Sequence, residues 1–228
     1  MRNRRTSGVL FLSVSVTVLS GCAAFRSGEA KPPEPWPVST AAGRQSVSLI
    51  ITGEAIVNDA RQDVPQRAID AWRGETERAY KESGLFSDVL LGAAETDLRA
   101  EIHVLDRGEG NMGLAMLSGL TLTLVPGNAY DEFTITTTFK DKEGRTLGTY
   151  EEAEGISFWM EFFLVFVMPF KSPNAVAKEV LYDLNRAVIE QARGAGLLAF
   201  NPVSAAYADW LALNAARAPR ETPPRLRR

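Results

Sequence analysis

An alternation of apolar and polar residues recurs in three separate segments, and it limits the fold more than any other property of the sequence. The segments are residues 46–52, 98–104 and 133–139. A period of two places successive side chains on opposite faces of a β-strand, so each segment has one face for a core and one for solvent. The chain is therefore expected to form a sheet that is covered on one side.

Two further strands and two helices complete the predicted core. Residues 86–91 read as a short strand, and residues 146–152 follow a charged turn at 140–144 that predicts a hairpin. The helices begin near Pro65 and Pro173, because proline is favoured in the first turn of a helix. After each proline, apolar residues recur at the 3.6-residue spacing of an amphipathic helix.

These elements predict one α+β domain over residues 46–193. We expect a mixed sheet of four or five strands, with the two helices packed on one face and with apolar helical or extended inserts. The order of strand 46–52, helix and strand 86–91 predicts a parallel pair. A length of 228 residues fits one such domain with attached segments.

The first 22 residues follow the pattern of an export signal. Arg2, Arg4 and Arg5 precede an uncharged apolar run at 9–19, which is too short to cross a bilayer. The run ends in Leu19, Ser20, Gly21 and Cys22. This segment resembles the lipobox of bacterial lipoproteins, in which leucine, a small residue and glycine or alanine precede a cysteine.

The resemblance implies that residues 1–21 are a signal peptide and that Cys22 becomes the lipidated first residue. Acyl chains such as palmitate would then hold the protein on a membrane. Ala23, in place of the aspartate that retains lipoproteins at the inner membrane of enteric-type bacteria, implies outer-membrane anchoring facing the periplasm. Residues 1–21 hold three arginines and no acidic residue, so the mature chain has a net charge of −6.

Two segments flank the predicted domain. Residues 22–45 are proline-rich and are expected to be a stiff tether in which Trp36 contacts either the domain or the lipid interface. Residues 194–228 are expected to be a tail with a short helix at 204–216 and a basic end. That end is interpreted either as solvated or as a contact for anionic lipid, lipopolysaccharide or peptidoglycan.

The composition excludes several classes of function. A net charge of −3 over the whole chain argues against nucleic-acid binding, and one cysteine with one histidine excludes a disulfide framework and multi-ligand zinc sites. A glycine pattern at 108–113 matches a dinucleotide motif, but Glu109 would face the pyrophosphate and no crossover helix fits behind it. We therefore predict no cofactor, no metal and no nucleotide.

No catalytic group is predicted. Ser118 lacks the preceding glycine of a nucleophile elbow, and His103 has no partner that the sequence can place. Three acids, Glu151, Glu152 and Glu154, are interpreted as guards of an exposed strand edge. The chain is therefore expected not to be an enzyme, with a peptidoglycan-acting enzyme that uses His103 or Glu152 as the remote alternative.

Two stretches are more apolar than a small soluble domain needs, namely residues 112–125 and 156–170. They bracket the hairpin 131–153, so both should lie at the same end of it. Either they close the core, or they form an apolar lobe for lipid, self-association or a hydrophobic partner. The candidate membrane or partner contacts are Trp159, Phe162, Phe163 and Phe166.

The order of elements, with Ser83, Gly84, Leu85 and Phe86 after the first helix, is similar to that of uncharacterised small envelope lipoproteins of Gram-negative bacteria. It also resembles the α/β domains of curli-secretion-type and penicillin-binding-protein-activator-type lipoproteins. The resemblance implies a non-enzymatic accessory or assembly role in the envelope, with an envelope protein or lipid as partner. The alternative is a lipoprotein that handles lipid or lipopolysaccharide through the apolar lobe.

Overall fold

Seven strands lie in one sheet of the computed structural model, which describes residues 21–28, 30–37, 45–121, 124–161, 164, 166 and 170–198. The spatial order is β1–β7–β6–β5–β2–β3, and β4 pairs with the first part of β2. The strands are β1 (Gly21–Arg26), β2 (Gln45–Val57), β3 (Ala60–Gln62), β4 (Phe86–Leu91), β5 (Leu98–Gly110), β6 (Gly127–Asp141) and β7 (Thr146–Glu161).

The sheet is mixed, as predicted. β2 runs parallel to both β4 and β5, and every other pairing is antiparallel. The two long hairpin strands, β6 and β7, are joined by a turn in which Gly144 has φ +82°, a left-handed conformation that favours glycine. The α+β class and the parallel pair across the first helix are confirmed.

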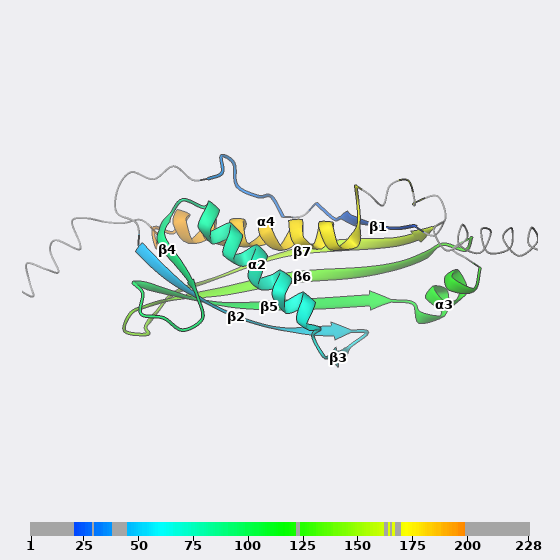
Figure 1. Cartoon of the computed structure of the whole chain (residues 1–228), viewed down its shortest axis with the longest axis horizontal. Helices are drawn as coiled ribbons and strands as arrows, with labels where there is room; N and C mark the ends of the chain where they lie inside the picture. Colours follow the sequence, from blue (N-terminus) through cyan, green and yellow to red (C-terminus); the bar gives the residue numbers. More distant parts are fainter. Residues whose placement is uncertain are drawn as a thin grey trace, which may run out of the picture.

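Two long helices cover one face of the sheet (Figure 1). α2 (Gln66–Glu82) follows Pro65, and α4 (Pro173–Gly194) carries its proline in the first turn. Gly84, with φ +73°, lies just beyond the end of α2. A third helix, α3 (Met112–Leu120), lies beyond the end of β5, apart from α2 and α4 (Figure 1).

The core lies between the sheet and the two helices. The alternation seen in the sequence places Leu49, Ile102 and Ile135 on the covered face, where all three are buried. Tyr80 of α2 is also buried and stacks on Phe86 with ring centroids 5.4 Å apart. The opposite face is polar, as one-sided sheets in contact with water are.

The sheet is larger than the four or five strands predicted. β3 is only three residues long, and β1 has no alternating pattern, so neither was expected. The described part of the predicted tether is also different, because residues 21–26 form β1, and residues 27–28 and 30–37 lie against the domain. The tether is therefore corrected to an edge strand followed by a docked segment.

Several expectations lie outside the described residues. They are the export signal at 1–20, residues 29 and 38–44 of the tether, and the tail from residue 199 with its short helix and basic end. Two of the candidate contact residues, Phe162 and Phe163, also lie outside the described part.

Candidate membrane-contact site

The two apolar stretches meet at one end of the sheet, as predicted from the hairpin. Gly127, the first residue of β6, pairs with Met160 of β7, and a Cβ placed on Gly127 would lie 2.9 Å from the Met160 methyl group and 3.2 Å from Ser118 of α3. A side chain at position 127 would therefore require the Met160 methyl group and the Ser118 side chain to move. α3 and the last part of β7 thus lie at the same end of the molecule (Figure 1).

Cys22 lies at this same end. It is the second residue of β1 and pairs directly with Met160. The side chain is half-buried, and burial raises the pKa of its thiol. The cysteine of the predicted lipobox is therefore part of the sheet and adjoins the second apolar stretch.

Large apolar side chains are exposed around this end. Leu120, the last residue of α3, and Leu124, which follows the helix, are 74% and 75% exposed, and Phe166 and Phe170 are 76% and 82% exposed. Met116 and Trp159 add to the same surface. We call these six residues the apolar rim.

The connection from β7 to α4 is held against β1 at both of its ends. Glu161 pairs with Gly21, and the backbone N–H of Ala24 donates a hydrogen bond of 2.9 Å to the carbonyl of Lys171. Phe166 and Phe170 belong to this connection, so the chain topology keeps them near Cys22.

The two stretches are neither wholly core nor wholly exposed. Ile156 is completely buried, and Ser118 is buried against the sheet, whereas the residues of the apolar rim face outward. The predicted contact residues in the described part, Trp159 and Phe166, both belong to the apolar rim and are 42% and 76% exposed.

A buried carboxylate fastens the segment that follows β1. Glu154 of β7 has no solvent exposure and accepts hydrogen bonds from the Ser27 hydroxyl, the Gly28 N–H (2.8 Å) and the Ala30 N–H (2.6 Å). Burial raises the pKa of Glu154, but these three donors and Arg26 outweigh it and hold the pKa below its usual value. Its expected role as the guard of an exposed edge is therefore wrong.

The same segment is also tied to α4. Arg26 donates to Asp183 at 2.6 Å, and Arg186 donates to the carbonyl of Pro33 at 2.7 Å. The guanidinium of Arg186 lies 5.0 Å from the ring centre of Trp36, a cation–π distance. Of the two positions left open for Trp36, the structure shows the one on the domain.

The remaining predicted polar residues do not converge. His103 lies exposed on the open face of the sheet, with its Nδ1 3.3 Å from the Thr52 hydroxyl. Glu151 accepts from Thr136, and Glu152 accepts from Gln191. In the described part of the chain, no three His, Cys, Asp or Glu side chains are grouped so as to hold a metal.

The glycine pattern at 108–113 forms a strand end and a helix start. Gly108 and Gly110 end β5, and the side chain of Asn111 accepts a hydrogen bond of 2.9 Å from the Leu114 N–H of α3. This geometry is that of a capped helix.

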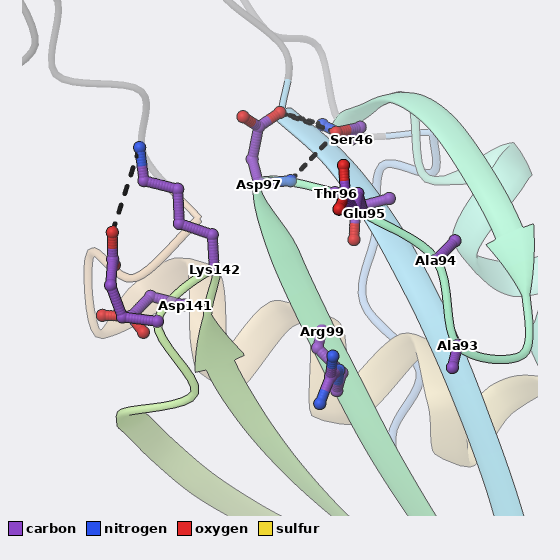
Figure 2. A pocket seen from close by; sticks show the side chains of 10 residues that line it. Ser46, Ala93, Ala94, Glu95, Thr96, Asp97, Arg99, Asp141 and Lys142 are labelled. Carbon is purple, nitrogen blue, oxygen red and sulfur yellow. Dashed lines mark hydrogen bonds and ion pairs between the residues drawn. The ribbon is translucent and has the colours of Figure 1, made fainter.

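A polar hollow of about 700 Å³ lies at the opposite end of the sheet (Figure 2). The Ser46 hydroxyl and N–H both donate to Asp97, which lowers the pKa of that carboxyl. Asp141 is bonded to Arg145 in the same way. Two of the carboxylates that line the hollow are thus bonded to neighbouring residues.

Two aspartates on the covered face were missed by the sequence analysis. Asp106 of β5 and Asp131 of β6 occupy positions that the period-two pattern reserves for apolar residues. That break in the pattern was the available signal.

Among the described residues, no helix is both long enough and apolar enough to cross a membrane.

No protein-family model and no curated protein sequence matches the chain. Among solved structures, a minor lipoprotein from Acinetobacter baumannii is similar at 14% identity, covering 66% of this chain and 92% of that one, with a TM-score of 0.40. A PelC dodecamer from Paraburkholderia phytofirmans is similar at 9% identity, covering 73% and 96%, with a TM-score of 0.35. With TM-scores below 0.5, these structures inform neither the activity nor the partners of this chain.

Proposed function

We propose that this chain is a membrane-anchored envelope lipoprotein of non-enzymatic, accessory type, whose apolar rim lies on the membrane that holds its lipid. Cys22 carries the anchor, and the protein faces the periplasm from the outer membrane. The body then serves as a platform that is held at a defined orientation for an envelope partner.

One observation carries the proposal: the lipobox cysteine and the apolar rim lie at the same end of the sheet. A lipid on Cys22 would leave little free chain between the membrane and the domain, because β1 begins at Gly21. The rim would therefore meet the bilayer wherever the anchor is inserted.

The energies favour such contact. Moving an exposed leucine or phenylalanine into an apolar environment contributes about 1.5–3 kcal/mol. Leu120, Leu124, Phe166 and Phe170 are each at least 74% exposed. Together they would contribute several kcal/mol beyond the anchor, enough to hold the orientation of the body.

The anchor is tested by metabolic labelling with radioactive palmitate in a Gram-negative host. The full chain should be labelled and the Cys22→Ser variant should not. Label that persists in the variant would show that Cys22 is not the lipidated residue.

The rim is tested by flotation with liposomes, using residues 22–228 with Cys22→Ser so that no lipid is attached. The parent should float, and the variant Leu120→Ser with Leu124→Ser, Phe166→Ser and Phe170→Ser should stay in the dense fraction while its circular dichroism is unchanged. The matched control replaces Leu91 and Leu147, which are exposed elsewhere on the sheet, with serine. Equal flotation of the rim variant and the control would contradict the membrane contact.

A further inference from the structure

α2 and α4 diverge toward their first turns and leave part of the sheet between them uncovered by helix. Their later parts are joined by Asn185, whose amide donates to the Thr76 hydroxyl at 3.2 Å, and by Tyr182, which donates to Glu82. Figure 1 shows the two helix axes separating toward their N-terminal ends. A cavity of about 310 Å³ lies in this wedge, with Asp106 and Phe133 at its floor.

The floor of the cavity carries a carboxylate that lacks a counter-charge. Asp106 pairs in register with Phe133, on the same face as the buried Val104. Asp131 lies nearby, because its Oδ1 is 2.6 Å from the point where a Cβ on Gly108 would be. In the described part of the chain, neither carboxylate forms an ion pair or a hydrogen bond with another residue.

The walls supply complementary groups. Trp72 of α2 is almost fully buried and presents an aromatic surface to the cavity. Arg67 of α2 and Lys178 of α4 lie at the opening of the cavity, and neither forms an ion pair with a described residue. The negative charge at the floor of the cavity and the positive charges at its opening are thus separated by a space of ligand size.

We propose that this cavity binds a small zwitterion, with an ammonium group on Asp106 and an anionic group between Arg67 and Lys178. This site goes beyond the proposed membrane contact and does not depend on it. The ligand has the chemistry shared by amino acids and by the phosphoethanolamine head group. The two sources, a free solute or a lipid, are separated by the experiment below.

The cost of the two aspartates supports a binding role. Burial, and then the charge of Asp131, raises the pKa of Asp106 to about 7, and burial raises the pKa of Asp131 to about 6. Unpartnered carboxylates that are half-buried destabilise a fold, and such groups concentrate where a ligand supplies the missing charge.

Binding should depend on pH in a defined direction. The titratable groups that face the cavity are Asp106 with the neighbouring Asp131, and the charged groups at its rim are Arg67 and Lys178. An ammonium ion pairs with ionised Asp106, so affinity should increase as the pH rises from 6 to 8.

Isothermal titration calorimetry of residues 22–228 with Cys22→Ser tests the site, with O-phosphoethanolamine and L-alanine as probes. At least one probe should bind, and ethanolamine and inorganic phosphate, which each lack one charge, should bind at least tenfold more weakly. Asp106→Asn should lose at least tenfold in affinity, and so should Arg67→Ala with Lys178→Ala. The control Glu109→Gln, on the exposed side of β5, should bind like the parent.

Absence of binding by both probes at millimolar concentration, or equal affinity of parent and Asp106→Asn, would overturn the site. Flotation with vesicles that contain phosphatidylethanolamine or only phosphatidylcholine then distinguishes the sources. A preference for phosphatidylethanolamine that Asp106→Asn abolishes assigns the site to a lipid head group. Probe binding without that preference assigns it to a free solute.

Discussion

At the scale of single residues, Glu154 and Asp106 show how opposite surroundings act on two carboxylates of one cross-strand row. Both pair in register with Phe133, one from β7 and one from β5. Glu154 accepts three hydrogen bonds and has a lowered pKa, whereas Asp106 has none and has a raised pKa. The first stabilises the fold and the second opposes it.

Asp106→Asn should stabilise the protein at neutral pH. The folded-state pKa of about 7 exceeds the usual 3.8, so the folded state binds more protons, and stability falls as the pH rises from about 4 through 7. The substitution should remove this decline and add on the order of 2 kcal/mol at pH 8. Urea unfolding at pH 5 and 8 measures it, and a variant that is less stable than the parent at both values would contradict the assignment.

Glu154→Gln should destabilise the protein by about 2–3 kcal/mol, because buried charge-assisted hydrogen bonds to two backbone N–H groups and a hydroxyl are weakened. The lowered pKa means that the contribution of Glu154 is present above pH 4.5 and is lost as the pH falls through the folded-state pKa. Thermal unfolding of parent and variant between pH 3 and 7 should therefore converge in acid. Glu151→Gln is the control, because Glu151 is exposed and lies three residues before Glu154 on the same strand. It should change the free energy of unfolding by less than about 0.5 kcal/mol.

At the scale of elements, β1 is the part of the sheet on which the proposed orientation depends. It holds six residues, all of them paired with β7, and Ala23 and Ala24 are completely buried. On the side of β1 away from β7, the backbone N–H of Ala24 donates a hydrogen bond to the carbonyl of Lys171.

Ala24→Pro should detach β1, since proline removes the N–H that binds the Lys171 carbonyl and its ring has no room at a fully buried site. We expect a loss of about 3 kcal/mol in urea unfolding and faster amide exchange at residues 156–161. Phe25→Ala, which keeps the backbone of β1, is the control. Unchanged exchange in the proline variant would show that β1 does not pair as described.

The sequence analysis identified the elements whose pattern is local. Alternation located β5 and the middle of β6, and Pro65 and Pro173 located both helix starts. β1 was not predicted because its six residues, Gly-Cys-Ala-Ala-Phe-Arg, carry no periodicity and pair with residues 130 to 140 positions away. The apolar rim was predicted in part, since composition shows that residues are apolar but not which of them the fold leaves exposed.

At the scale of the whole molecule, the covered core, the apolar rim and the polar hollow lie along one axis. The rim and Cys22 occupy one end of the long strands, and the hollow formed by residues 93–97 and 141–143 occupies the other. A body that stands on its rim would therefore present the polar hollow away from the membrane.

This orientation predicts which of the three described tryptophans meets lipid. Trp159 is at the rim, whereas Trp72 is buried and Trp36 is docked on α4; Trp210 lies outside the described residues. With vesicles whose acyl chains are brominated, the fluorescence of residues 22–228 with Cys22→Ser and Trp210→Phe should be quenched, and adding Trp159→Phe should abolish most of that quenching. Quenching that survives in Trp159→Phe would place the lipid contact elsewhere on the chain.

The pairing of β1 with β7 also has a mechanical consequence. A force that draws Cys22 away from the body pulls along the axis of β1, so the hydrogen bonds to β7 and to Lys171 are loaded together and in shear. A strand peeled sideways would instead release its bonds one after another. A pulling force between the membrane and a partner at the far end of the molecule would thus be transmitted along the strands of the sheet, and β1 would connect the sheet to the anchor.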